Sequence, residues 1–194
     1  MQLLQDRIRR EGKVLPGNII KVDGFLNHRV DTKLLEALAD EFAKHFDISK
    51  ITLVLTAEAS GIALATVCAN KYGVPMLFAK KAKSDNIEGG LYQSEVFSYT
   101  YKKKFTMIVS HEWLHASDHV LIIDDFMAKG NAMQGLIDLV HAAGATLEGI
   151  GVAVEKGFQG GGDKFRAMKD VPYKALAVIE SASAEDGITF REDD

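Results

Sequence analysis

The order of hydrophobic and polar residues along the chain predicts an alternation of strands and helices. Behind Asp31, a residue type that caps helices well, apolar residues recur at the spacing of one helix face and predict an amphipathic helix over 32–46. These residues are Leu34, Leu35, Leu38, Ala39, Phe42 and Phe46. The apolar, β-branched run that follows at 51–56 is typical of a strand buried inside a parallel sheet.

The same scheme then repeats along the chain. A helix after the polar turn 58–61 should end near Tyr72, because Gly73 and Pro75 stop it, and 75–80 is predicted to be a strand. A strand over 119–124, a helix over 131–143 and a strand over 146–155 follow further on. This pattern predicts an α/β fold with a central, mainly parallel sheet flanked by helices. Because the 194 residues are 47% apolar, we expect one domain spanning 1–194.

Two stretches interrupt the alternation. The segment 81–93 is charged, contains Gly89 and Gly90, and is longer than most connections inside a compact domain, which predicts a mobile functional loop or lid. The segments 94–101 and 105–111 should form an antiparallel pair of strands. The glycines at 160–162 indicate a flexible point or a close approach of two backbone segments.

Composition narrows the possible environments and partners. The net charge is −4 and the sequence pI is about 5.9, so a general nucleic-acid binder is disfavoured and any phosphate binding should be local. Cys68 is the only cysteine, which excludes an internal disulfide and fits a reducing cytoplasm. The first ten residues lack the pattern of a secretion signal, and no run is long enough to span a membrane. We therefore expect a cytoplasmic protein without a membrane partner.

The segment 111–115 matches the H-E-x-x-H zinc motif, with His111 and His115 as its histidines. That motif works on a long helix, where both histidines share one face with the metal. Here only about eight residues separate two apolar strands, too few for such a helix. We interpret the match as a chance occurrence in a connecting loop, and we expect no protein-built metal site.

The segment 120–132 is the stronger candidate for chemistry. Four apolar residues form a buried strand, Asp124 and Asp125 lie at its carboxyl end, and a turn of small residues leads into a helix. Ligands of open α/β sheets bind at that edge, and a helix N-terminus attracts anions. We therefore predict a phosphate-binding turn made of Ala128, Lys129, Gly130, Asn131 and Ala132.

The two aspartates could accept hydrogen bonds from neighbouring sugar hydroxyls or hold a hydrated Mg²⁺. The segment as a whole thus predicts a site for a phosphorylated sugar. A helix cap with a solvated neighbour, or the acidic pair of a signalling receiver domain, would look similar, although in receivers the acids lie near the start of the chain. The G-x-G-x-x-G and P-loop patterns of common nucleotide sites are absent from the sequence.

Together these motifs resemble the type I phosphoribosyltransferases, which use phosphoribosyl diphosphate. The strand, the Asp124-Asp125 pair and the small-residue turn resemble that family's ribose-phosphate signature. Residues 58–61 resemble its diphosphate loop, 81–93 with the following hairpin its flexible catalytic loop, and 154–158 its base-reading segment. Residues 18–28 resemble the hood of the bacterial members that use xanthine, and the match runs essentially end to end.

The resemblance implies a fold, an activity and a set of contacts. It implies the type I phosphoribosyltransferase fold, with a hood built roughly from 1–30 and 156–194. It implies a purine-salvage reaction in which xanthine and phosphoribosyl diphosphate give xanthosine 5′-monophosphate and diphosphate, with Mg²⁺ held mainly by substrate and water, in a homodimer. The residues implied to bind phosphoribosyl diphosphate, besides the phosphate turn, are Glu58, Ala59, Ser60, Gly61 and Lys81.

The same resemblance assigns the purine to Ile20, Asn27 and Lys156, while Phe25 and Phe158 could stack on the base. Asp124 and Asp125 would be the catalytic carboxylates, favouring positive charge on the ribose ring. Ala59 departs from the family pattern, because many relatives place a serine there. Ala128 and Ala132 cannot donate hydrogen bonds as the hydroxyl residues of many relatives do, so backbone amides must do more.

Two alternatives to xanthine transfer stay open at this point. The base could be guanine, hypoxanthine or adenine with the same chemistry. The chain could also be a non-catalytic transcription regulator that senses phosphoribosyl diphosphate, although the residues before the hood are too few for a DNA-reading winged helix and the net charge is negative.

Overall fold

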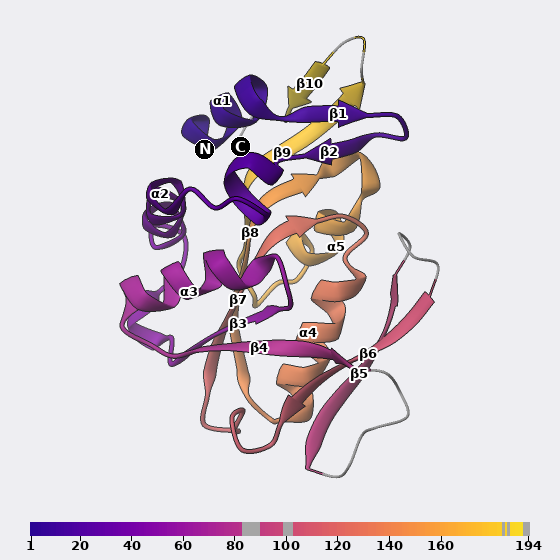
Figure 1. The fold of residues 1–194 in the computed structure, drawn as a ribbon. Helices are drawn as coiled ribbons and strands as arrows, with labels where there is room; N and C mark the ends of the chain where they lie inside the picture. The colour runs from indigo at the N-terminus through magenta and orange to yellow at the C-terminus, as the bar shows by residue number, and fades with distance from the viewer. Residues whose placement is uncertain (83–89, 99–102, 184, 186, 192–194) are drawn as a thin grey trace.

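The protein is an eight-stranded sheet with helices on both faces and a small hairpin at one end (Figure 1). The computed structural model describes residues 1–82, 90–98, 103–183, 185 and 187–191. The helices are α1 (Gln2–Glu11), α2 (Thr32–Phe42), α3 (Gly61–Tyr72), α4 (Asn131–Ala142) and α5 (Gly161–Arg166), with short helical turns η1 (Asp23–Asn27), η2 (Ile48–Lys50) and η3 (Gly157–Gln159). The strands are β1 (Lys13–Leu15), β2 (Ile19–Lys21), β3 (Leu53–Ala57), β4 (Met76–Ala82), β5 (Leu91–Ser98), β6 (Lys103–Ser110), β7 (His119–Met127), β8 (Thr146–Lys156), β9 (Tyr173–Ser183) and β10 (Gly187–Phe190).

The centre of the large sheet is parallel. Its strand order is β10-β9-β8-β7-β3-β4-β6-β5, and the pairs β4/β3, β3/β7, β7/β8 and β8/β9 are all parallel. Among the described residues of this sheet, the antiparallel pairs lie towards the edges, at β9/β10, β4/β6 and β6/β5. The predicted α/β fold is therefore confirmed. After β3 the chain continues to β4, towards one edge of the sheet, and after β7 it continues to β8, towards the other edge. The carboxyl ends of β3 and β7 therefore form a topological switch point, where such sheets bind ligands.

Helices cover both faces of the sheet, which is why the central strands are apolar throughout. Leu121 and Ile123 of β7 belong to the core under α2 and α3, whereas Val120 and Ile122 belong to the core under α4. Side chains alternate between faces along a strand, so a strand covered on both sides needs a continuous apolar run. The buried sheet thus gives the residues at its carboxyl edge a rigid support.

The predicted helices are present, with small differences at their ends. Asp31 caps α2 as predicted, its carboxylate accepting a hydrogen bond from the Leu34 N–H at 3.2 Å. The helix ends at Phe42 instead of Phe46, because the N–H groups of Lys44 and His45 bond three residues back in turns. Phe46 is nevertheless buried and lies 6.2 Å from the Phe42 ring, so the apolar pattern was read correctly although the helix bound was wrong.

The first and last parts of the chain pack together. Helix α1 contacts β9 and β10, and the β1–β2 hairpin contacts β9 (Figure 1). Leu4 and Ile8 of α1 share one core with Leu176 and Ile179 of β9. These elements were not predicted from the sequence. Among the described residues, no helix is long and apolar enough to cross a membrane.

The predicted lid at 81–93 needs a correction at both ends. Lys81 and Ala82 belong to β4, and β5 begins at Leu91, so only the middle of that segment connects the strands. Its residues 83–89, Gly89 among them, lie outside the described residues. The antiparallel pair that follows is confirmed, with β5 and β6 in register from Leu91 opposite Ser110 to Ser98 opposite Lys103. The pair packs on α4, where a Cβ on Gly135 would lie 2.5 Å from Val96.

Candidate active site

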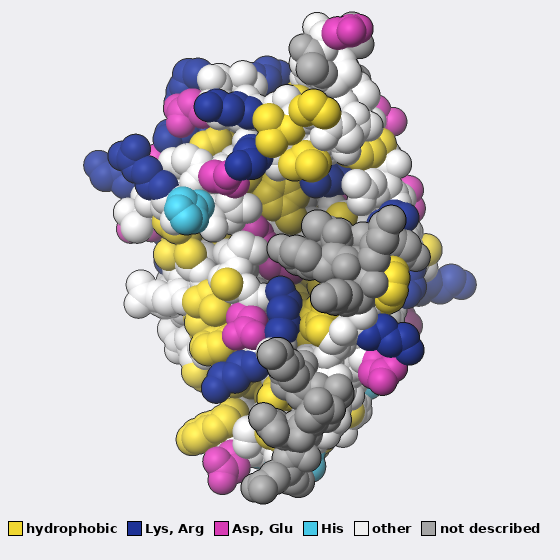
Figure 2. Space-filling model, turned by 45° about the vertical axis from the view of Figure 1, so that its right-hand side comes forward, with side chains coloured by type: hydrophobic (Ala, Val, Ile, Leu, Met, Phe, Trp, Pro, Cys, Tyr) yellow, Lys and Arg dark blue, Asp and Glu magenta, His cyan; other side chains and the backbone are white. Residues whose placement is uncertain are grey.

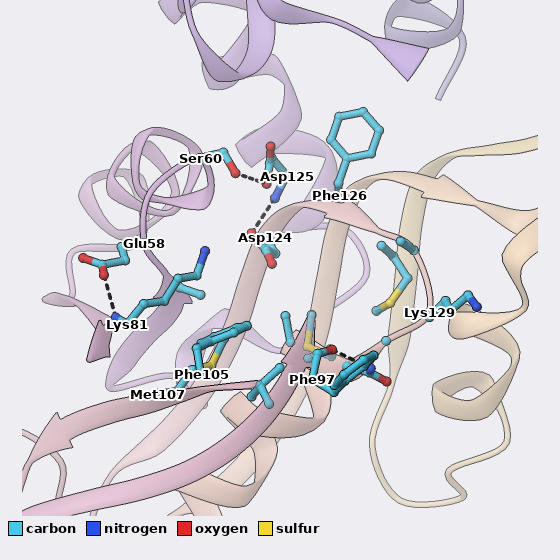
Figure 3. A pocket seen from close by; sticks show the side chains of 18 of the residues that line it. Glu58, Ser60, Lys81, Phe97, Phe105, Met107, Asp124, Asp125, Phe126 and Lys129 are labelled. Carbon is cyan, nitrogen blue, oxygen red and sulfur yellow. Dashed lines mark hydrogen bonds between the residues drawn. The ribbon is translucent and has the colours of Figure 1, made fainter. Parts of the chain in front are cut away.

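A cavity of about 320 Å³ lies at the carboxyl ends of β3 and β7 (Figure 3). Its size is in the range of small-molecule sites, and its position is the switch point of the sheet. Three predicted parts of the sequence contribute to its lining: Glu58 and Ser60 of the turn 58–61, the stretch 124–132, and Lys81. The β5–β6 hairpin closes one side of it with apolar side chains: Val96, Phe97, Phe105 and Met107.

Asp124 and Asp125 lie in the last part of β7, which continues to Met127 beyond the predicted end at 124. They are 8% and 4% exposed, and the Asp125 N–H donates to the Asp124 carboxylate at 2.9 Å. Burial is the main cause that raises the pKa of Asp124 well above its usual range, and the charge of Asp125 adds to it. The Lys81 ammonium opposes this rise. Two carboxylates are thus held side by side facing one cavity.

Two hydrogen bonds orient Asp125. The Ser60 hydroxyl donates to one carboxylate oxygen at 2.9 Å, and the Asn27 amide donates to the other at 3.2 Å. Ser60 comes from the turn after β3 (Figure 3) and Asn27 from η1, so three separate segments meet at this carboxylate. These two contacts hold the Asp125 carboxylate in one orientation at the cavity.

The turn from Ala128 to Ala132 borders the cavity along its whole length. Gly130 has φ +82°, a conformation that L side chains rarely adopt, and it is the cap residue of α4. The unpaired N–H groups at the start of this 12-residue helix therefore lie beside the cavity. The Asn131 amide donates to the Phe97 carbonyl at 2.8 Å, so it ties the turn to the hairpin.

The turn 58–61 connects β3 to α3 on the other side of the aspartates. The Glu58 carboxylate accepts a hydrogen bond from the Lys81 N–H at 2.5 Å, and the Glu58–Ala59 peptide bond is cis. Gly61 packs so closely that a Cβ there would overlap Thr56 Oγ1 and Asp124 Oδ1. Lys81 Nζ lies 5.6 Å from the Phe105 ring centroid. Glu58, Ser60 and Lys81 line the cavity, whereas Ala59 and Gly61 do not.

Of the residues predicted to bind a purine, Asn27 and Lys156 contact residues that line the cavity. Lys156 Nζ lies 5.5 Å from the ring centroid of Phe126, which lines the cavity, and burial lowers the pKa of Lys156. Phe158 is 37% exposed and available for stacking, and Ile20 is buried. Phe25 is different: it is 0% exposed, with the Arg7 guanidinium over its ring at 5.3 Å. The prediction that Phe25 stacks on a ligand therefore conflicts with its position in the core.

Several cavity residues were not predicted as site residues. They are Ala57 and the four apolar residues of the hairpin, together with Phe126, Met127, Met133 and Gln159. The alternating pattern of 94–101 and 105–111 predicted the hairpin but not which of its faces meets the site. Gln159 follows the predicted base segment directly, and only its place in space brings it to the cavity.

The H-E-x-x-H match lies in the turn between β6 and β7, as expected for a chance occurrence. The His111 ring packs on the Tyr92 ring with centroids 4.1 Å apart, while the His115 N–H donates to Asp118. Across the described part of the chain, no group of three His, Cys, Asp or Glu side chains is arranged to hold a metal ion. Cys68 is buried in α3, and burial raises the pKa of its thiol to about 12.

Comparison with protein families gives the site its context. The family model described as phosphoribosyl transferase domain matches residues 27–171, which is well over half of the chain. The chain belongs to the phosphoribosyltransferase family. The matched span contains both aspartates, the turn 128–132 and the turn 58–61, so the cavity lies within the part of the chain that this family shares.

Individual phosphoribosyltransferases match over the whole chain. The xanthine phosphoribosyltransferase of Bifidobacterium longum (strain NCC 2705) is 53% identical, over 98% of this chain and 100% of that protein. That of Lachnoclostridium phytofermentans is 51% identical, over 100% of both chains. The crystal structure of adenine phosphoribosyltransferase from Saccharomyces cerevisiae has a TM-score of 0.72 at 19% identity and covers 91% of this chain and 99% of that one. The fold is therefore the type I phosphoribosyltransferase fold.

Proposed function

We propose that this phosphoribosyltransferase joins xanthine to the ribose of phosphoribosyl diphosphate, giving xanthosine 5′-monophosphate and diphosphate in purine salvage. One observation carries the proposal: relatives more than 50% identical along their whole length are xanthine phosphoribosyltransferases. The cavity supports it, since an acidic pair and a helix N-terminus border the same space. Transfer to guanine, hypoxanthine or adenine would use the same sugar site.

The sugar phosphate fits the turn from Ala128 to Ala132. Unpaired N–H groups and the partial positive charge of a helix N-terminus stabilise an anion. Small residues leave the backbone accessible, and Lys129 adds a positive charge beside it. With the phosphate there, Asp124 and Asp125 would accept hydrogen bonds from the two ribose hydroxyls.

The chemistry is a displacement at C1 of the ribose. A purine ring nitrogen forms the new bond, the bond from C1 to the diphosphate oxygen breaks, and the purine gives up a proton. Positive charge develops on the sugar ring in between, as in glycoside cleavage. Asp124 and Asp125, the second held by Ser60 and Asn27, would stabilise that charge through space.

The leaving diphosphate fits the turn 58–61. Ala59 and Ser60 lead into α3, which begins at Gly61, so the backbone there would offer N–H groups to an anion as the start of α4 does. Lys81 lies between this turn and the hairpin and would add a positive charge to the diphosphate side. The segment 83–89 lies outside the described residues, so its predicted role as a lid stays a prediction.

Mg²⁺ would neutralise charge on the diphosphate when bound. The donor set fits an ion carried in by the substrate: two buried carboxylates reach the cavity, and the described residues offer no cluster of three metal-ligating side chains. The chain's own carboxylates nearest to such an ion would be those of Asp124 and Glu58, which both line the cavity.

The purine would lie between the aspartates and η3. Lys156 would donate to a carbonyl oxygen of xanthine, Asn27 would offer its amide, Ile20 an apolar wall, and Phe158 a ring for stacking. A half-buried lysine suits a base rich in carbonyl oxygens, because burial strengthens its hydrogen bonds. Phe25 would support η1 from the core instead of touching the base.

The remaining parts of the proposal concern the whole protein. By likeness to its family we propose a cytoplasmic homodimer, with xanthine and phosphoribosyl diphosphate as its small-molecule partners and with neither nucleic acid nor membrane as a partner. We also propose one domain, with the hood formed by about 1–30 and 156–194, the two chain segments that pack on each other around β9.

The test is product formation. Purified protein with Mg²⁺, phosphoribosyl diphosphate and each purine base in turn should use xanthine with the highest kcat/KM, which the release of diphosphate measures. Lys156→Met should raise KM for xanthine more than KM for phosphoribosyl diphosphate, because it removes the donor to the carbonyl oxygens. Exposed Lys44→Met is the matched control. Absence of turnover with every base would refute the proposal, and a clear preference for another base would correct the substrate.

A further inference from the structure

A buried carboxylate lies behind the phosphate turn, outside the cavity. Glu155 is 0% exposed and stands near the end of β8, opposite Met127 of β7. It does not line the cavity, and none of the roles proposed above uses it. A buried charge costs free energy unless it is paired, so a carboxylate at this place needs a physical reason.

Glu155 is fully paired by two side chains. Arg166 donates to one carboxylate oxygen through Nη1 at 3.0 Å and to the other through Nη2, a two-pronged contact. The Tyr173 hydroxyl donates to the carboxylate at 2.8 Å, and the Arg166 guanidinium lies 5.1 Å from the Tyr173 ring centroid. Arg166 is the last residue of α5, so the pair fastens this short helix to β8 and β9.

Helix α5 also packs directly against the turn 128–130, which we propose to bind the sugar phosphate. A Cβ on Gly161 would lie 2.7 Å from Lys129 C and 2.8 Å from Gly130 N, so the two backbones touch directly. Phe165 is fully buried under Gly130, where a Cβ would lie 2.7 Å from its ring. The glycines at 160–162 were predicted to mark a close approach of two backbone segments, and Gly161 is the position where that approach requires a glycine.

The other side of α5 touches the carboxylate itself. A Cβ on Gly162 would overlap the Glu155 carboxyl group, so the helix has no room to shift while that group is in place. Lys164 Nζ also donates to Gln134 of α4 at 2.5 Å. The helix is thus held between the carboxylate on one side and the turn on the other.

We propose that Glu155, Arg166 and Tyr173 form a positioning cluster that presses α5 onto the turn 128–130 and so fixes the backbone amides that take the sugar phosphate. The inference rests on the proposed function only for the identity of that ligand. The cluster acts through the turn, and its residues do not touch substrate.

The experiment separates the cluster from general stability. Tyr173→Phe removes one hydroxyl and keeps the ring packed near Phe165. The hydrogen bond that is lost is worth about 1 kcal/mol, so we expect the affinity for ribose 5-phosphate to be about fivefold weaker. Calorimetry measures this affinity. Arg166→Met should weaken it by roughly tenfold or more, since the buried charge loses its partner. Arg166→Lys should restore part of the loss. Exposed Arg10→Met is the matched control and should leave binding unchanged.

Kinetics and hydrogen exchange complete the test. In the cluster variants KM for phosphoribosyl diphosphate should rise more than kcat falls, and the amides of 128–132 should exchange faster than those of the distant α2. Folded variants with wild-type affinity and wild-type exchange in the turn would overturn the inference. If the wild type turned over no purine, the proposed function would fail, while exchange in Tyr173→Phe would still decide whether the cluster fixes the turn.

Discussion

Two neighbouring residues of the same type are made chemically different by their contacts. Asp125 receives hydrogen bonds on both carboxylate oxygens, from Ser60 and Asn27. Asp124 is buried beside it, and burial raises its pKa. The sequence predicted the pair and its place at a strand end. It could not predict the difference, because Asn27 is far away in the chain and its amide reaches Asp125 only through the fold.

Replacing Asp124 by Asn should separate activity from stability. In an acid whose folded pKa is raised, the stabilising contribution is complete below the unfolded pKa and disappears as pH rises through the folded pKa. The wild type should therefore lose stability relative to Asp124→Asn from about pH 4 upwards, and the loss should level off above the folded pKa. Denaturant unfolding at a series of pH values measures this.

The same substitution, which should stabilise the protein above about pH 4, should lower its turnover. Asp124→Asn should lower kcat by about 100-fold, because a neutral amide replaces one of the two carboxylates beside the charged sugar. The exposed Asp170→Asn serves as control for both measurements. A variant that kept wild-type turnover, or whose stability followed the wild type at every pH, would contradict the role given to Asp124.

At the scale of elements, the central part of the fold was predictable and both ends were not. Continuous apolar runs predicted β3, β7 and β8, and helical spacing with Gly73 and Asp31 as stop and cap predicted α2 and α3. These patterns are strong because burial on both faces of a sheet demands them. β1, β2 and β10 are only three or four residues long, too short for a period to be recognised.

Helix α5 and strand β9 were missed for different reasons. α5 has six residues, two of them glycine, so its sequence favours a loop, and only contacts with Glu155 and the phosphate turn make it helical. β9 contains the apolar run 175–179, a signal that was available in the sequence. The residues of β5 and β6 that line the cavity could not be predicted, because alternation along a strand does not show which of its faces points into the site.

The start of α3 gives a prediction at this scale. Gly61→Ala should improve helix propensity by about 1 kcal/mol, yet the new Cβ would overlap Thr56 and Asp124 in a packed environment. We expect the overlap to dominate, with a net loss of about 1–3 kcal/mol in the free energy of unfolding and a lower kcat. Thermal unfolding and steady-state kinetics measure the two effects.

Gly24→Ala is the matched control, because a Cβ there would meet nothing within 4 Å. It should change neither quantity by much. Equal behaviour of the two alanine variants would mean that the turn 58–61 has room to adjust and does not hold Asp124 in place.

At the scale of the whole molecule, charge separates the enzyme from a regulator that binds DNA. The net charge is −4, and on the face shown in Figure 2 acidic and basic side chains are interspersed. DNA binding needs a basic surface that neutralises several phosphates. The anion site that we propose in the cavity is instead local, with a helix N-terminus and single lysines.

The whole protein should therefore show no affinity for duplex DNA, even at about 50 mM salt, where electrostatic binding is strong. Fluorescence anisotropy with a labelled duplex measures this, with and without phosphoribosyl diphosphate. Tight binding that weakens steeply as salt rises would revive the regulator hypothesis.

The position of β7 in the middle of the sheet also affects when the enzyme can become active as it folds during synthesis. β7 pairs with β3, which precedes it in the chain, and with β8, which follows it, while α5 follows later still. A chain leaving the ribosome would carry both aspartates before it carries the strand and helix that hold them. Such non-local parallel pairing is slow to form. Substrate affinity would thus arise only in the last stage of folding, and ligands would stabilise the finished protein and no earlier intermediate.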